Sequence, residues 1–257
     1  MYAQLPLLGN IRIERKVVIN GTPTDIQLHG FCDASEKGYG ACIYLRSRTF
    51  NEDPVVKLLC AKPRVAPLKE VSLPRLELCG ALLLVHLLNR TILVLNLSIT
   101  AINLWTDSTI VLSWFTSPPG RWKTFVANRV TEIQEESSLD QWRHVPSAQN
   151  PADLISRGVT PEALVDNNLW WRGPSWLSST SSLWPSMNNQ HAEANVPEQR
   201  KPVSTFTTFN GQDDFILKFS NLSRLQRVLA YVLRFLSNTK LPSKERETGA
   251  LNRKNSS

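Results

Sequence analysis

Residues 28–46 read LHGFCDASEKGYGACIYLR. Two runs rich in alternating, β-branched and aromatic residues flank a polar loop at residues 36–38, which is the pattern of an antiparallel hairpin. The preceding VVING, residues 17–21, has strand character and leads into a turn at residues 21–23. VVKLLCA, residues 55–61, predicts a further strand. We therefore expect three consecutive strands, with Asp33 at the end of the first.

A helix and strand pattern follows this sheet. Pro74 suits the first position of a long helix over residues 74–92, whose leucines form a broad apolar face. AINLWT (101–106) predicts a buried strand, STIVLSWF (108–115) a short helix and residues 121–136 an amphipathic helix. QWRHVP (141–146) predicts the last strand, and Pro151 opens a terminal helix. This order predicts an α/β fold with a mixed sheet flanked by helices.

Four carboxylates fall at the ends of these elements. Asp33 and Asp107 end strands, Glu77 lies in the first turn of the long helix, and Asp153 begins the last helix. Because such ends meet at one edge of a sheet, we expect the acids to cluster and to require cations, and oxygen ligands favour Mg²⁺ or Mn²⁺. Two ions about 4 Å apart activate water and stabilise the leaving oxygen in an in-line attack on phosphate.

Each acid also has an ordinary explanation. A single Asp is more often a helix cap or turn residue than a ligand, and Glu77 favours the helix dipole wherever it lies in a first turn. The four contexts together favour the metal site. Beside the acids, the small Ser35 lets a nucleic-acid backbone approach, and Ser108 and Thr109 are placed to cap a helix and contact phosphate.

The composition limits the possible partners. The chain has 257 residues and a formal net charge of +7, which favours a polyanionic partner without proving one. The four cysteines lack zinc spacing and suit buried, reduced thiols. The most apolar stretch, residues 82–97, is interrupted by polar residues, and the N-terminus lacks a secretory signal. We expect a soluble intracellular protein, cytoplasmic or nuclear, without a membrane partner.

The motifs resemble a known family. In order, LHGFCDASEKGYGACIYLR, LPRLELCGALLL, LWTDSTIVLSWF and WRHVPSAQNPADLISRG resemble the ribonuclease H region of BEL/Pao-type retrotransposon polyproteins, a region also labelled Pao retrotransposon peptidase. LWWRGPSWL and LSRLQRVLAYVLRFL resemble the connector that leads towards the integrase. The resemblance spans residues 11–238.

The resemblance implies a ribonuclease H-like fold, with a five-stranded mixed sheet and helices on both faces. It implies a two-metal endonuclease that cleaves the RNA strand of an RNA–DNA hybrid, recognised by backbone shape. Asp33 would bridge both ions, Glu77 and Asp107 would hold one, and Asp153 would complete the other. Asn150 matches the family's asparagine just before the last Asp, and we include it among the expected nucleic-acid contacts. Upstream reverse transcriptase and downstream integrase segments would be its polyprotein partners, and virus-like particles one cytoplasmic location.

Some family features are missing. His144 lies within the last strand and not in the loop after it, so it is not carried over as the mobile histidine of such enzymes. No cysteine follows Cys79, so the integrase zinc site is not expected, and no Asp-Ser/Thr-Gly supports a protease. An inactive or domesticated fragment that binds nucleic acid without cutting is the alternative to an active nuclease.

The domain boundaries follow from these assignments. Residues 1–26 are a lead-in from the upstream polyprotein, 27–160 the ribonuclease H-like domain, 161–212 a Trp-rich connector and linker, and 213–257 a short helix with a flexible basic tail. We expect a partly disordered C-terminal extension with one helix, over residues 221–237. Trp170, Trp171 and Trp176 are packing anchors or stacking platforms for bases. A basic set either lines the hybrid groove or forms a solvated surface: Lys37, Arg121, Lys123 and Arg129.

Overall fold

The computed structural model describes residues 2–50, 52–185, 196–200 and 221–240. It divides into a unit from Met1 to Lys201 and a second from Pro202 to Ser257. The predicted linker and tail fall partly on residues 186–195, 201–220 and 241–257, which lie outside the described residues. In the second unit, α8 (Leu222–Thr239) confirms the helix predicted over residues 221–237.

The first unit is built on the predicted five-stranded mixed sheet. Its strands are β1 (Asp25–Ala34), β2 (Gly38–Arg48), β3 (Val55–Val65), β4 (Ala101–Thr106) and β5 (Trp142–His144). They lie in the order β3-β2-β1-β4-β5. The three N-terminal strands pair antiparallel, whereas β4 is parallel to both β1 and β5. The carboxyl ends of β1 and β4 therefore meet at the same edge.

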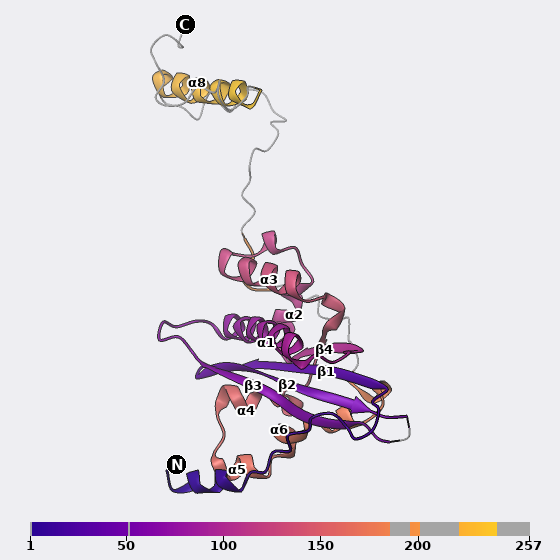
Figure 1. The fold of residues 1–257 in the computed structure, drawn as a ribbon. Coiled ribbons are helices and arrows are strands. Elements are labelled where there is room, and N and C mark those ends of the chain that lie inside the picture. Colours follow the sequence, from indigo (N-terminus) through magenta and orange to yellow (C-terminus); the bar gives the residue numbers. More distant parts are fainter. Residues whose placement is uncertain (1, 51, 186–195, 201–220, 241–257) are drawn as a thin grey trace. The chain divides into compact units, whose positions relative to one another are not determined.

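Helices cover both faces of this sheet (Figure 1). One face carries α1 (Leu73–Leu95), α2 (Thr109–Phe115) and α3 (Thr124–Glu136). On the other face, α4 (Asp153–Arg157) contacts β1 and β2, α6 (Asn168–Arg172) contacts β3, and α5 (Pro161–Val165) contacts η1. The remaining 3₁₀ helices are η1 (Tyr2–Asn10), η2 (Pro119–Arg121), η3 (Leu139–Gln141), η4 (Ser147–Gln149), η5 (Ser175–Ser178) and η6 (Ser181–Leu183).

Helix α1 supplies the largest part of the core on the first face. Leu78, Leu84 and Val85 are fully buried and belong to one cluster with the inward side chains of β1 and β2. Burying each such side chain stabilises the fold by roughly 1.5–3 kcal/mol. By length and composition α1 could also cross a membrane. In this fold its apolar residues instead cover the sheet, so α1 is a core helix.

Two polar side-chain contacts join α1 to α3. His86 Nε2 lies 2.8 Å from Glu132 Oε1. Asn89 Nδ2 donates to Glu136 Oε2 at 2.9 Å. Both contacts come from the carboxyl-terminal half of α1, and we assign them to holding α3 against it.

The opposite face is aromatic and is covered by residues that follow α4. Phe31 and Trp105 of the sheet pack with Trp176 of η5 in a second buried cluster. Two polar side chains of β2 reach the same segment: Tyr44 Oη donates to the Trp170 carbonyl at 2.7 Å, and Arg46 Nε to the Leu177 carbonyl at 2.9 Å.

The boundary predicted at residue 160 therefore has to be corrected. The compact unit continues to Lys201, and its Trp-rich segment is part of the core and not a separate connector. The physical reason is that the five-residue α4 is too short to cover the apolar second face. Trp176 is a packing anchor, as one of the two sequence-based alternatives held.

The strand character of VVING is also a wrong prediction. Residues 17–20 are not in a strand. The backbone N–H of Ile19 donates to Ser47 Oγ at 2.9 Å and the Ile19 side chain is buried, so a side-chain hydrogen bond to β2 and apolar packing hold this segment in place of a ladder.

Truncating Trp176 tests whether this segment belongs to the core. Trp176 is 9% exposed, and its Nε1 donates to Gln149 Oε1 at 2.8 Å. We expect Trp176→Ala to lower the free energy of unfolding by about 3–5 kcal/mol, measured by urea denaturation. Phe50→Ala is the control, since Phe50 is 86% exposed, and should change it little. Equal effects of the two substitutions would contradict the corrected boundary.

Candidate active site

Asp33 is the buried member of the predicted acid set. It lies one residue before the end of β1, is 5% exposed, and its Oδ2 accepts a hydrogen bond from Ser156 Oγ of α4. Burial, with the charges of Asp107 and Asp153 adding to it, raises the pKa of Asp33 to about 7 against the opposing hydrogen bond from Ser156. Asp107 and Asp153 thus act electrostatically on one buried carboxyl.

Asp107 lies beside Asp33 because of strand pairing. Cys32 of β1 pairs with Thr106 of β4 in parallel register, and Asp33 and Asp107 are the next residues of the two chains. Ser147 Oγ donates to Asp107 Oδ2 at 2.5 Å. Two acids on adjacent parallel strands therefore share the carboxyl-terminal edge of the sheet, as the sequence predicted.

Glu77 approaches from α1. Ser108 Oγ, at the start of α2, donates to Glu77 Oε2 at 2.6 Å. Burial raises the pKa of Glu77, and the charge of Asp107 adds to this increase. Glu77 is the fifth residue of α1, so its predicted place in the first turn is wrong: α1 begins at Leu73, and Glu77 lies in the second turn. It gains little from the helix dipole there, which weakens the ordinary explanation for it.

Asp153 is the first residue of α4, as predicted. Arg157 Nε lies 2.5 Å from Asp153 Oδ1, one helical turn further along. The charge of Asp153 contributes to the raised pKa of Asp33. The fourth acid therefore belongs to the same electrostatic cluster, with one oxygen in an ion pair.

Two glycines allow the helices to come this close. A Cβ atom on Gly80 of α1 would lie 3.1 Å from the Asp33 carbonyl oxygen. On the opposite face, a Cβ atom on Gly40 would lie 2.2 Å from Ile155 Cγ2 of α4, and Gly40 is the register partner of Asp33. The helices that carry Glu77 and Asp153 thus approach β1 from its two faces at the level of Asp33.

Two of the predicted nucleic-acid contacts, Asn150 and Ser108, form hydrogen bonds with other residues of the fold. Asn150 is fully buried: its Nδ2 donates to the Cys32 carbonyl at 3.0 Å and its Oδ1 accepts from the Ala152 N–H at 3.1 Å. Ser108 caps α2 through the Val111 N–H, besides its bond to Glu77. We assign both to positioning the acids.

Ser35 and Thr109 are less constrained. Ser35 Oγ donates to the Ser156 carbonyl at 2.6 Å and accepts from the Lys37 N–H at 3.1 Å. Thr109 is the half-buried first residue of α2. Contact of these two residues with nucleic acid stays a prediction.

Sequence reasoning missed two serines that bond the acids, Ser147 and Ser156. Both lie in the string SAQNPADLIS, residues 147–156, which also holds Asn150 and Asp153. Ser156 follows Asp153 by three residues, the spacing that places two side chains on one side of a helix. Three of the four acids accept a hydrogen bond from a serine hydroxyl, and the fourth pairs with an arginine.

The acids fit a hard divalent cation by their chemistry. All four offer carboxylate oxygens, and the pKa values of Asp33 and Glu77 are raised by burial and by neighbouring carboxylates, a cost that a cation would relieve. Their spacing is wider than that of a closed cation site. Among the described residues, the one trio of metal-ligand side chains with ligand atoms within 4.8 Å of one another is His86, Glu132 and Glu136, which lie between α1 and α3.

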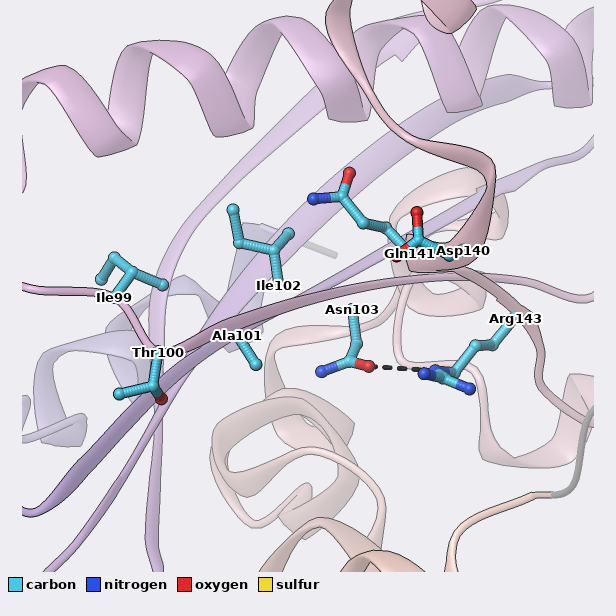
Figure 2. Close-up of a pocket in the computed structure, with 8 residues that line it drawn as sticks. All are labelled: Ile99, Thr100, Ala101, Ile102, Asn103, Asp140, Gln141 and Arg143. Atoms are coloured by element: carbon cyan, nitrogen blue, oxygen red, sulfur yellow. Dashed lines mark hydrogen bonds between the residues drawn. The ribbon is translucent and has the colours of Figure 1, made fainter.

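A hollow of about 410 Å³ lies away from these acids (Figure 2). It is lined by Ala101 to Asn103 at the start of β4 and by Arg143 of β5, whose Nε donates to Asn103 Oδ1 at 2.9 Å. Asp107 follows the opposite end of β4. The acid cluster is therefore set at a sheet edge and not in this hollow.

The sheet order, its mixed pairing and the helices on both faces define a ribonuclease H-like fold. The family model described as Pao retrotransposon-like RNaseH-like domain matches residues 1–108, a range that contains Asp33, Glu77 and Asp107. This match agrees with the resemblance that the sequence motifs indicated, over the part of the chain that the family model covers. No curated protein matches the sequence.

Several solved structures are similar to part of the chain. The N-terminal RNase H domain of Rv2228c from Mycobacterium tuberculosis, solved as a maltose-binding protein fusion, is 14% identical, with 52% of this chain and 91% of that chain covered and a TM-score of 0.34. RNase H1 from Halobacterium salinarum is 17% identical, with 56% and 99% covered and a TM-score of 0.33. LC11-RNase H1, from a compost metagenome and solved in complex with an RNA/DNA hybrid, is 12% identical, with 55% and 99% covered and a TM-score of 0.35.

Replacing Asn150 tests its positioning role. Asn150→Ala would leave the Cys32 carbonyl and the Ala152 N–H buried without their present partner, and we expect a loss of about 2–4 kcal/mol in the free energy of unfolding. Chemical denaturation measures this loss. Asn128→Ala, on the exposed surface of α3, is the matched control with little expected change. A neutral Asn150→Ala would remove Asn150 from the positioning set.

Removing the Asp33 charge should stabilise the metal-free protein in a pH-dependent way. The folded-state pKa is raised from 3.8 to about 7, so the folded state binds the proton more tightly, and wild-type stability falls as pH rises from about 4 to 7. Asp33→Asn avoids this loss. Its advantage in free energy of unfolding should grow over that window and level off near 2–4 kcal/mol, at roughly 1.4 kcal/mol per pKa unit.

Thermal melts from pH 4 to 8 in EDTA measure the difference between Asp33→Asn and wild type. Added Mg²⁺ or Mn²⁺ should raise the melting temperature of wild type more than that of Asp33→Asn. A difference that is independent of pH, or equal metal effects on the two proteins, would count against the acid cluster.

Proposed function

We propose that this chain is a metal-dependent endonuclease that cleaves the RNA strand of RNA–DNA hybrids as part of a retrotransposon polyprotein. The observation that carries the proposal is that β1, α1, α4 and the residue after β4 bring four acids to one edge of the sheet, where Asp107 and Asp153 act on Asp33 and Asp107 acts on Glu77. The family match supports the retrotransposon setting. Under this proposal the neighbours are reverse transcriptase and integrase segments, and the location is cytoplasmic, in virus-like particles, or nuclear.

The chain's own residues would hold the metal ions and order the reacting groups. Asp33, Glu77, Asp107 and Asp153 would hold two Mg²⁺ or Mn²⁺ ions, which supply an activated water and stabilise the leaving oxygen. The serine hydroxyls at Asp33, Glu77 and Asp107 fix the carboxylate orientations, which limits reorganisation when the reaction occurs. Arg157 would give up part of its contact with Asp153 when that oxygen becomes a ligand.

One observation favours the alternative, a fragment that binds nucleic acid without cutting it. No three of the four acids bring their ligand oxygens within 4.8 Å of one another, and Asp153 is engaged by Arg157. In this alternative the ion pair is permanent and the cluster stays open. Hybrid binding without cleavage would support it.

Cleavage of a labelled hybrid tests the proposal. Wild type with Mg²⁺ should cut the RNA strand of an RNA–DNA hybrid, and should leave the same RNA alone and duplex DNA intact. Asp33→Asn and Asp107→Asn should each lower the rate by about 100-fold or more, because both ions act in one transition state.

Asp140→Asn is the matched control, since Asp140 is an exposed acid of η3 at the far end of the sheet, and should retain the wild-type rate. Cleavage that persists in EDTA, or that survives both active-site substitutions, would reject the nuclease proposal. Denaturation curves for each variant separate loss of chemistry from loss of fold.

A further inference from the structure

A five-residue segment from Val196 to Arg200, which we call the strap, crosses the α1–α3 side of the first unit. Val196 is buried in the core cluster, and Trp114 Nε1 donates to the Pro197 carbonyl at 3.1 Å. Backbone bonds then pair the strap with residues 121–123, since the Lys123 N–H donates to the Glu198 carbonyl and the Arg200 N–H to the Arg121 carbonyl, each at 2.8 Å. The strap is therefore held by packing and backbone bonds that do not involve the Glu198 side chain.

The Glu198 carboxylate nevertheless makes its own set of contacts. Arg75 binds both of its oxygens, with Nε at 3.0 Å from Oε1 and Nη2 at 2.9 Å from Oε2. Lys123 Nζ lies 3.7 Å from Oε2. The hydrogen bond and charge of Arg75, with the charge of Lys123, lower the pKa of Glu198 in spite of its burial. This bidentate arginine geometry binds a carboxylate and a phosphate equally well.

The surroundings carry more positive charge than one carboxylate balances. Arg75 Cζ lies 4.9 Å from the centre of the Phe125 ring, and Arg129 Cζ lies 3.6 Å from it. We call Arg75, Lys123 and Arg129 the cradle. Arg75 and Lys123 both contact the Glu198 carboxylate, so two cations share one acid, and Arg129 lies on the same Phe125 ring as Arg75.

The backbone at Glu198 is strained. Its φ is 69°, in the left-handed region that disfavours residues with a side chain. Such conformations persist where the surroundings fix them, and they gather at functional positions. A glycine would suit the turn better, so the backbone does not explain why a glutamate stands there.

The cradle and the acid cluster share the amino-terminal end of α1, on different sides of the helix. Arg75 precedes Glu77 by two residues on α1, about 3 Å along the helix axis at 1.5 Å per residue. Glu77 faces Ser108 of α2, and Arg75 faces Phe125 of α3. Because each nucleic-acid strand carries a charge about every 3.4 Å along its axis, a strand at the acids brings further phosphates to this end of α1.

We propose that the cradle is a binding site for a backbone phosphate of nucleic acid, and that the Glu198 carboxylate occupies it until nucleic acid displaces it. The inference rests on the proposed function for the identity of the partner. It gives Arg75 a role that the sequence did not suggest, and it makes Glu198 an internal competitor of the substrate. The alternative is that the Glu198 side chain has only a structural role and holds the strap against α1.

Hybrid binding by the full chain distinguishes these explanations. In an Asp107→Asn background, which prevents cleavage, binding of a fluorescent RNA–DNA hybrid is measured by anisotropy from 50 to about 300 mM salt. If Glu198 fills the cradle about nine-tenths of the time, Glu198→Gln should tighten binding about tenfold. The slope of log K against log salt should steepen by about one, the contribution of one added phosphate contact.

Two further variants control for charge and for site. Glu135→Gln makes the same change in net charge at an exposed position of α3 and should leave the slope unchanged. Arg75→Gln added to Glu198→Gln should remove both the tighter binding and the extra slope. Equal effects of Glu198→Gln and Glu135→Gln, or a gain that survives Arg75→Gln, would overturn the proposal.

The outcomes separate this inference from the nuclease assignment. If the chain cuts hybrids but Glu198→Gln does not change hybrid binding, the nuclease proposal stands and the cradle proposal is overturned. The cradle proposal is also overturned if thermal melts show that Glu198→Gln only lowers stability. If the chain does not cut hybrids but Glu198→Gln raises its affinity for them, the cradle proposal stands and the nuclease proposal fails. Failure of wild type and Glu198→Gln to bind at any salt concentration overturns the cradle.

Discussion

The close approach of α1 and α4 to one register pair of the sheet, Asp33 of β1 and Gly40 of β2, is the constraint on which the site depends. At Gly80, α1 comes within contact distance of the Asp33 backbone, and at Gly40 the sheet admits Ile155 of α4. A Cβ atom at Gly40 would overlap Ile155, and one at Gly80 would crowd the Asp33 carbonyl oxygen, so glycine suits both positions. The acids on α1 and α4 reach the strand acids because of these two contacts, one on each face of the sheet.

This packing also sets the electrostatics of the site. Bringing carboxylates together at a partly buried edge disfavours their ionised forms, which is why the pKa values of Asp33 and Glu77 are raised. Serine hydroxyls offset part of that cost by bonding the charged oxygens. The fold therefore maintains an unfavourable arrangement of charge, as expected where charge serves binding or chemistry more than stability.

Local sequence pattern predicted the parts of this structure that local physics controls. The strands around Asp33 and Asp107, the long helix and the start of α4 at Asp153 follow from periodicity, β-branching and proline position. The Trp-rich segment could not be placed this way, because an irregular sequence carries no period, and its role depends on the aromatic face of the sheet. The same holds for Glu198, whose partner Arg75 lies 123 residues earlier in the chain. Nothing near Glu198 in the sequence indicates that partner.

The residues that cover the aromatic face of the sheet have a consequence for where the chain tolerates a cut. Because Trp176 and Leu177 lie on the aromatic face of the sheet, a cleavage that removed everything after α4 would leave Phe31 and Trp105 open to water. Newly exposed aromatic surface of this kind promotes self-association of the protein. The aromatic face therefore stays covered only while the chain after α4 is retained, at least as far as Leu177.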